Sequence, residues 1–164
     1  MRFIETPEAP LPAGHYSQAV VANGFVFVSG LLPIVPNSNR RIPEGIRAQA
    51  EQTFANLSAV LKGAESGIEQ LVSVQVFIPD ITVWGEINEV YRGLLGEHKP
   101  ARTVVPCGSL RDGALIEVNA VAVVAPRNAV SRTIEGASQA RVDCEEPLTP
   151  ASSTTMSGMG RSSP

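Results

Sequence analysis

The segment that most constrains the fold is the apolar run at residues 71–78, which is rich in valine and isoleucine. Such residues favour extended backbone, and the run is typical of a buried strand. Apolar residues at helical spacing lie on both sides of it, at 46–61 and at 83–95, where Trp84 and Tyr91 fall on the apolar side. The chain is therefore expected to pack a central strand against two helices.

Two further pairs of strands complete the predicted sheet. Residues 17–22 and 25–28 flank Asn23-Gly24, a dipeptide that favours a tight hairpin turn. Residues 101–107 and 114–124 are extended runs joined by a turn-like segment, which predicts a second hairpin. Together these elements predict one mixed β-sheet with two helices packed on one face.

The run at 114–124 also indicates how the sheet is covered. Successive residues of a strand point to opposite faces, and in this run both sets are largely apolar. The two helices cover one face only, so the other face needs a second cover. A partner subunit is the simplest one.

The predicted domain ends near residue 125. From Thr149 to Pro164 nearly every residue is serine, threonine, glycine or proline, and such a segment buries too little apolar surface to offset its ordering entropy. We interpret residues 1–125 as one domain and 126–164 as a polar tail that is expected to be disordered.

Composition argues against several classes of function. The net charge is −3 and the basic residues are scattered, so no stripe for nucleic acid is present. No apolar run approaches the roughly 20 residues of a membrane helix, and no secretion signal opens the chain. The two histidines lack neighbouring metal ligands, and no phosphate loop follows a strand. Cys107 and Cys144 form no disulfide framework. We expect a cytoplasmic protein without metal, cofactor, nucleic-acid partner or membrane partner.

Arg102 and Glu117 are the charged residues that stand out in the predicted strands. A guanidinium in an apolar strand is costly unless it meets an anion, and its planar fork suits a carboxylate. Glu117 is the only acid in its strand. If Cys107 lies opposite Asp112 in a hairpin, Arg102 faces Glu117 across it. Such a pair has two interpretations. It is either a cross-strand ion pair that only fixes the strand register and stabilises the sheet by about 0.2–1 kcal/mol, or part of a ligand site at a subunit boundary.

Six short motifs occur in order along the predicted domain. They are Gly14-His15-Tyr16-Ser17-Gln18-Ala19, Val28-Ser29-Gly30, Asn56-Leu57, Asn88-Glu89-Val90-Tyr91, Pro100-Ala101-Arg102 and Ile116-Glu117-Val118. In this combination the chain resembles the Rid family (YjgF/YER057c/UK114), the reactive intermediate deaminases, over about residues 5–125. The resemblance implies an α+β, chorismate-mutase-like fold that assembles as a homotrimer, with its sites in the clefts between subunits.

The resemblance also implies an activity, the hydrolysis of 2-imino acids, derived from enamines such as 2-aminoacrylate, to 2-keto acids and ammonia. Arg102 matches the arginine that grips the substrate carboxylate, Glu117 the acid that helps to place the attacking water, and Tyr16 the tyrosine of the cleft. Gly30 and Val104 are expected to supply backbone contacts to the substrate. Because an imine is already electrophilic, this chemistry needs positioning rather than a metal or a strong nucleophile.

The sequence departs from the usual pattern of that family at several positions. His15 stands where proline is common, Leu31 where glutamine usually follows Ser-Gly, and Val104 where many members have cysteine. The loop at 37–41 lacks the usual Pro-x-Thr-Gly turn. These changes bear on substrate range, and Leu31 favours larger or less polar substrate side chains.

Two alternatives stay open at the level of sequence. One is a pathway-specific deaminase of the same fold that acts on an aminomuconate-like acid. The other is a non-catalytic, chaperone-like trimer that binds small carboxylates. The presence of both Arg102 and Glu117 favours chemistry, because binding a carboxylate needs only the arginine.

Overall fold

A computed structural model describes residues 1–125, and the predicted tail at 126–164 lies outside the described residues. Three strands come before the first helix: β1 (Arg2–Ile4), β2 (Ala19–Ala22) and β3 (Phe25–Leu31). Helix α1 (Ile46–Gly63) and strand β4 (Leu71–Ile78) follow, and then helix α2 (Trp84–Leu95) and strands β5 (Ala101–Pro106) and β6 (Glu117–Val123). Single 3-10 turns span Ile68–Gln70, Ile81–Val83 and Arg111–Gly113.

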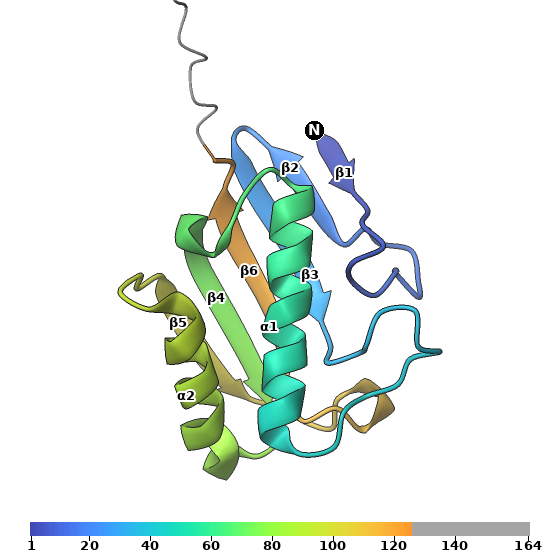
Figure 1. Cartoon of the computed structure of the whole chain (residues 1–164), viewed down its shortest axis with the longest axis vertical. Coiled ribbons are helices and arrows are strands. Elements are labelled where there is room, and N and C mark those ends of the chain that lie inside the picture. Colours follow the sequence, from blue (N-terminus) through green and yellow to red (C-terminus); the bar gives the residue numbers. More distant parts are fainter. Residues whose placement is uncertain (126–164) are drawn as a thin grey trace, which may run out of the picture. The chain divides into compact units, whose positions relative to one another are not determined.

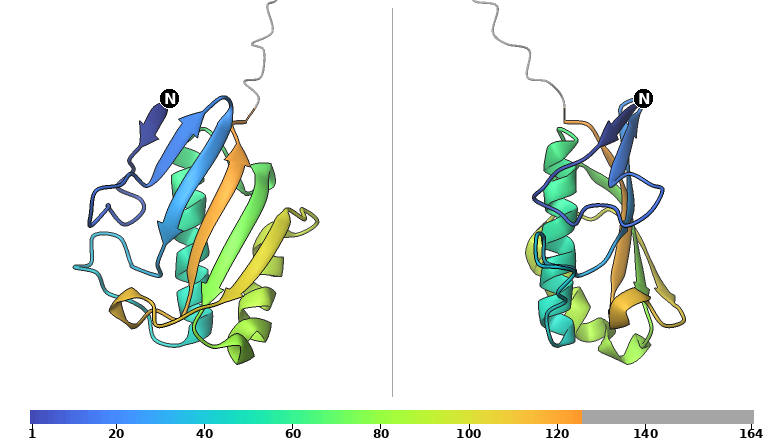
Figure 2. Two further views of the ribbon diagram at one scale, coloured as in Figure 1. Left: turned by 180° about the vertical axis from the view of Figure 1, so that it is seen from behind. Right: turned by 90° about the vertical axis from the view of Figure 1, so that its right-hand side faces the viewer.

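The strands form one six-stranded mixed sheet in the order β1-β2-β3-β6-β4-β5. Both helices pack on the same face of this sheet (Figure 1), and the edge-on view in Figure 2 shows the helices as one layer and the strands as the other. The α+β architecture expected from the sequence, one mixed sheet with two helices on one face, is confirmed. No helix in residues 1–125 is long and apolar enough to cross a lipid bilayer.

The elements that the sequence predicts best are fixed by local chemistry. β4 covers Leu71–Ile78, the same residues as the apolar run. Asn23 and Gly24 both adopt positive φ, 50° and 80°, as a tight two-residue turn between strands requires, and they join β2 to β3. Beyond the end of α1, Glu65 adopts a left-handed conformation with φ 59°, which turns the chain towards β4.

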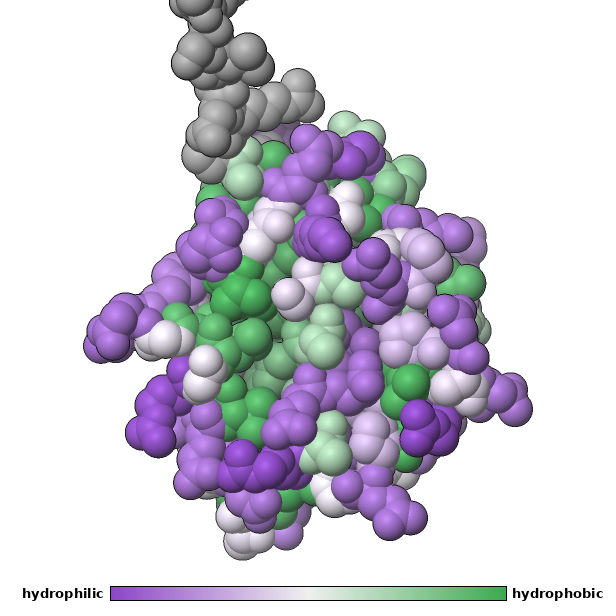
Figure 3. All heavy atoms as spheres, in the orientation of Figure 1, coloured by the Kyte–Doolittle hydropathy of each residue, from purple (hydrophilic) through white to green (hydrophobic). Residues whose placement is uncertain are grey.

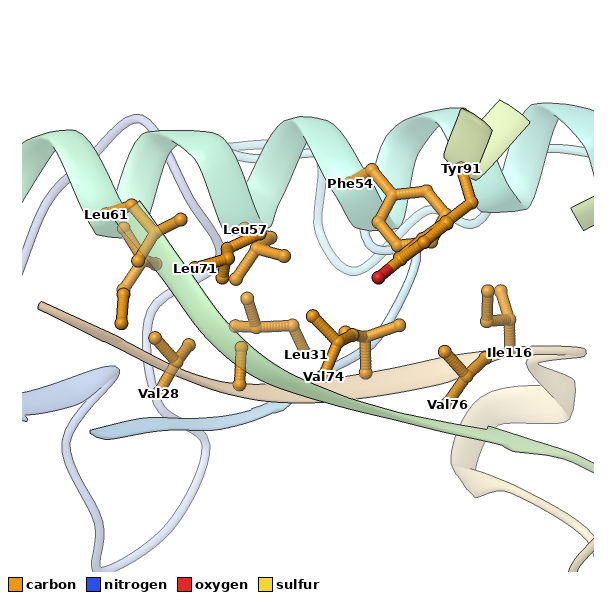
Figure 4. Packing of buried hydrophobic residues seen from close by; sticks show 14 of the residues in the cluster. Val28, Leu31, Phe54, Leu57, Leu61, Leu71, Val74, Val76, Tyr91 and Ile116 are labelled. Atoms are coloured by element: carbon orange, nitrogen blue, oxygen red, sulfur yellow. The ribbon is translucent and has the colours of Figure 1, made fainter. Parts of the chain in front are cut away.

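The core lies between α1 and the helix-facing side of the sheet (Figure 4). Phe54, Leu57 and Leu61 project from α1 towards the strands, where Val74 and Val76 of β4 are completely buried. Each fully buried side chain of this size contributes about 1.5–3 kcal/mol of transfer free energy. This layer therefore holds α1 in a fixed position against β3, β4 and β6.

Within residues 1–125, the opposite face of the sheet carries no helix (Figure 2). This face exposes large apolar side chains. Phe3, Phe25 and Phe27 are 67%, 42% and 48% exposed. Val121 of β6 lies in register with Phe27, so the apolar surface continues across the sheet. The helix side, by contrast, is mostly hydrophilic, with one hydrophobic area on the left of the view (Figure 3). The cover of the open sheet face by a partner subunit stays a prediction.

The predicted hairpin between residues 101–107 and 114–124 is wrong. β5 pairs in parallel with β4 at the edge of the sheet, and β6 lies antiparallel between β3 and β4. Arg102 is in register with Val74, and Glu117 with Phe77. Val74 and Phe77 are three residues apart on β4, so Arg102 and Glu117 point to opposite faces of the sheet.

Two physical reasons account for this topology. The helix α2 connects β4 to β5, and a strand–helix–strand crossover places the two strands in parallel. Val118, Ala120 and Ala122 of β6 are buried on the helix side of the sheet, and a strand between β3 and β4 buries them more completely than a strand at the edge would. The short connection at residues 107–116 therefore returns the chain to the middle of the sheet.

Candidate functional site

A cavity of about 450 Å³, which we call the Glu117 cavity, opens beside the end of β3 and the start of β6. Three of the predicted site residues, Tyr16, Gly30 and Glu117, line it. Leu31 also lines it, although the Leu31 side chain is buried in the core. The structure thus brings together three residues that lie far apart in the sequence.

The side chain of Glu117 lies directly over Gly30. A β-bulge interrupts the pairing of β3 with β6 between Val28 and Leu31. A Cβ atom on Gly30 would fall 3.1 Å from the carboxyl carbon of Glu117 and closer still to one of its oxygens. The absence of a side chain at Gly30 therefore creates the space that the carboxylate occupies.

Glu117 has no hydrogen-bond or ion-pair partner among the described residues. Its side chain is half-buried, and this burial raises the pKa of the Glu117 carboxyl above its usual value. A carboxylate with free lone pairs and a raised pKa is suited to accept a proton from water and to return it. Glu117 is the general-base candidate of the cavity.

Tyr16 reaches the cavity from the loop before β2, and its side chain is 54% exposed. The buried amide of Gln18 anchors the N-terminal segment beside it. Gln18 Oε1 accepts from the N–H of Thr6 at 2.6 Å, and Nε2 donates to the carbonyls of Thr6, Ala9 and Pro10. Because Pro10 lines the cavity, this amide fixes one of its walls.

Two buried amides on α1 hold backbone segments of the cavity wall or next to it. Asn56 Nδ2 donates to the carbonyls of Leu32 and Ile34, at 3.0 and 2.9 Å. Gln49 Oε1 accepts from the N–H of Leu115 at 2.8 Å, two residues before β6 begins. Sequence reasoning missed the role of these amides, because their partners are backbone groups that leave no pattern in the sequence.

Arg102 lies elsewhere, in a cavity of about 300 Å³ on the helix side of β5 that we call the Arg102 pocket. Its guanidinium carbon lies 4.6 Å from the ring centroid of Trp84 and 4.9 Å from that of Tyr91. Arg102 Nη1 donates to Asn88 Oδ1 at 3.0 Å. The cation–π contacts and this hydrogen bond orient the guanidinium, which has no carboxylate partner in residues 1–125. The group is thus prepared to bind an anion.

Trp84, Asn88 and Tyr91 stand at positions i, i+4 and i+7 of α2 and so share one face of the helix. The interpretation of the apolar side of α2 is confirmed for Tyr91, which is buried and packs edge-on against Phe54 at 5.6 Å (Figure 4). Burial raises the pKa of the Tyr91 hydroxyl. The same side chains also hold Arg102, a role that the helical spacing alone does not indicate.

Val104 lies two residues beyond Arg102 on the edge strand β5, outside the Glu117 cavity. The N–H of Cys107 donates to the carbonyl of Ile78, towards β4, at 3.0 Å. Since N–H directions alternate along a strand, the N–H of Val104 points to the open edge of the sheet. Among residues 1–125 this N–H has no acceptor and is therefore placed as a backbone donor, whereas the Val104 side chain packs against the core.

Comparison with known proteins identifies the family. Residues 6–124 match the family described as Endoribonuclease L-PSP. A RutC family protein of Aquifex aeolicus is 42% identical over 75% of this chain and 99% of its own length. The chain belongs to the Rid family. A rat protein named 2-iminobutanoate/2-iminopropanoate deaminase is 34% identical over 76% of this Rid protein and 91% of its own length.

The crystal structure of RidA from an Antarctic Psychrobacter is 33% identical to this Rid protein and superposes with a TM-score of 0.73. The match covers 76% of this chain and all of the RidA chain. Sequence and structure therefore agree on family and fold over the domain described here.

Proposed function

We propose that this Rid protein hydrolyses 2-imino acids to 2-keto acids and ammonia. The observation that carries the proposal is the half-buried carboxylate of Glu117, which has no partner within residues 1–125 and is held over Gly30 in a cavity. The guanidinium of Arg102, which meets no carboxylate among the described residues, supplies the complementary anchor for the carboxylate that every 2-imino acid carries. The name of the rat relative supports the same reaction.

The proposed reaction needs little beyond positioning. Glu117 accepts a proton from water as the water oxygen forms a bond to the imine carbon. The imine nitrogen takes up one proton in this addition and a second one afterwards, and it leaves as ammonia when the carbon–nitrogen bond breaks. The hydroxyl group that came from the water loses its remaining proton in the same step, which produces the keto group. Substrate and water supply every atom of the products, and no oxidant or reductant is required. Tyr16 lies at the cavity mouth, where it contacts the bound substrate.

We further propose that the site forms between copies of the chain in a homotrimer. Arg102 and Glu117 point to opposite faces of one sheet, so a substrate that touches both must lie between two copies. Phe25 and Phe27 on the open sheet face supply apolar surface for such an interface. The N–H of Val104 at the edge of β5 then lies beside the substrate carboxylate.

The proposal is tested by imine trapping. An amino-acid oxidase generates imino acids from a panel of amino acids, and semicarbazide traps the fraction that survives. The purified protein is expected to suppress the trapped product for at least some of them. A lack of suppression across the whole panel would rule out general deaminase activity and favour a specialised substrate or carboxylate binding without catalysis. An RNA cleavage assay in parallel tests the activity that the family description names.

Gly30→Ala is expected to lower kcat/KM by at least about tenfold while the protein stays folded. The added methyl group occupies the place of the Glu117 carboxylate, and only that flexible side chain has to move, so orientation is lost rather than packing. Gly93→Ala on the exposed side of α2 is the matched control, since a Cβ there meets no atom within 4 Å. Equal activities of both variants would argue against a defined position for Glu117.

A further inference from the structure

The Glu117 cavity contains two arginines, Arg40 and Arg111, that the proposed hydrolysis does not use. Arg40 comes from the loop between β3 and α1, and Arg111 from the 3-10 turn before β6. Both approach Asp112, but in different ways. Arg40 Nε donates to Asp112 Oδ2 at 3.1 Å, and Arg40 Nη2 donates to the same oxygen. The charge of Asp112 is therefore matched by Arg40.

Arg111 is left with most of its hydrogen-bonding capacity. Its nearest contact with Asp112 is from Nε, at 3.9 Å, which is too long for a hydrogen bond. No other described residue pairs with its guanidinium, and Glu117 forms no ion pair with it although both line the same cavity. The terminal amino groups of Arg111 are thus free to bind a planar anion.

The backbone fixes the turn that carries Arg111. Asp112 has φ 60° and Gly113 has φ 72°, so two successive residues are left-handed. Aspartate tolerates this conformation better than most residues do. The contact from Arg40, made across 72 residues of sequence, ties Asp112 to the loop that forms another wall of the cavity. Arg111 is consequently presented at the cavity by a turn that Arg40 ties to the neighbouring loop.

The remaining wall of the cavity is largely apolar and includes Leu11, Leu31 and Ile34. Apolar walls with an unmatched cation among them suit an aliphatic chain that ends in an anion. A substrate with one carboxylate would leave Arg111 without a partner once Arg102 is occupied.

We propose that Arg111 binds a second carboxylate on the substrate side chain, so that the protein prefers imines of dicarboxylic amino acids to imines of neutral ones. This proposal rests on the proposed function, in which Arg102 of another copy binds the carboxylate next to the imine carbon. Two carboxylates are then matched by two guanidinium groups, with Glu117 at the reacting carbon. The overall reaction converts a 2-imino dicarboxylate and water into a 2-keto dicarboxylate and ammonia.

The test compares two imines that share a five-carbon chain, 2-iminoglutarate from glutamate and 2-iminopentanoate from norvaline. The ratio of kcat/KM for the first to that for the second is measured in the wild type, Arg111→Ala and Arg111→Lys. Hydrogen bonds to charged groups are strong enough that the ratio should fall about tenfold or more in Arg111→Ala. In Arg111→Lys the ratio should lie between the values of Arg111→Ala and the wild type, because lysine keeps the positive charge. Arg47→Ala, an exposed cation outside the cavity, should leave the ratio unchanged.

The outcomes separate this inference from the function on which it rests. An unchanged ratio in Arg111→Ala, or an equal loss for both imines, would overturn the role of Arg111 while the deaminase activity stands. A wild type that hydrolyses neither of these two imines would overturn the role of Arg111, whereas the proposed deaminase function fails only if no imine of the whole panel is hydrolysed. Binding provides a second readout: 2-oxoglutarate should raise the Tm of the wild type more than 2-oxopentanoate does, and Arg111→Ala should abolish that difference. The absence of any such difference in the wild type would also overturn the proposal.

Discussion

Arg102→Ala is expected to lower kcat/KM for imine hydrolysis by about a hundred- to a thousandfold, because two charge-assisted hydrogen bonds to the substrate carboxylate are lost. The loss should appear with every 2-imino acid, since all share that carboxylate. The free energy of unfolding of the variant should lie within about 1 kcal/mol of the wild-type value, because Arg102 is exposed and cation–π contacts are weak at such a site. The measurements are imine trapping and denaturant unfolding.

Arg102→Lys separates charge from geometry at the same position. Lysine keeps the positive charge but lacks the planar fork that fits a carboxylate and stacks on Trp84 and Tyr91. We expect activity between that of the wild type and that of Arg102→Ala. Full activity in the alanine variant would show that the carboxylate is bound elsewhere.

Glu117→Gln is expected to reduce kcat by about 10²–10⁴-fold, the usual contribution of a general acid or base. Glutamine fills the same space over Gly30 but cannot accept the proton of water. Glu51→Gln, an exposed carboxylate on α1, is the control and should leave kcat unchanged. Wild-type activity in Glu117→Gln would exclude proton transfer by Glu117.

Glu117→Gln should also stabilise the folded protein at neutral pH. Burial raises the pKa of Glu117 above its ordinary value of 4.5, so the folded state binds this proton more tightly than the unfolded state. The carboxylate therefore lowers stability as pH rises through the interval between the ordinary and the raised pKa. In thermal unfolding at pH 7, the Tm of Glu117→Gln should be higher than that of the wild type. The difference should shrink when the pH falls below the ordinary pKa of a glutamate carboxyl. An inactive variant that is less stable at pH 7 would instead indicate a structural role.

The parts of the fold that were predictable are those decided within a short stretch of chain. The composition of residues 71–78 requires a buried strand, and Asn23-Gly24 favours positive φ at both positions whatever surrounds it. The pairing of β5 was not predictable in this way. Two extended runs joined by a turn-like segment look like a hairpin, but the α2 crossover and the burial of the helix-facing residues of β6 decide the strand order.

The residues of the candidate site also differ in how well they can be predicted from the sequence. Sequence reasoning indicated Arg102, Glu117, Tyr16, Gly30 and Val104 as candidates, and the structure groups three of them in one cavity. The residues that support them were not apparent, because a buried amide or a stacking ring is recognised only by what it contacts. The approach of Arg40 to Asp112 joins loops that no local pattern relates.

The most direct test of the account mixes the two inactive variants, Arg102→Ala and Glu117→Gln, by co-expression or by joint refolding. If each site takes Arg102 from one copy and Glu117 from another, random assembly restores about a quarter of the sites. Light scattering of the same sample reports whether trimers form. We predict recovery to about a quarter of wild-type imine hydrolysis in the randomly assembled sample as a whole. Mixed trimers that remain as inactive as either variant alone, or a protein that stays monomeric, would contradict a site shared between copies.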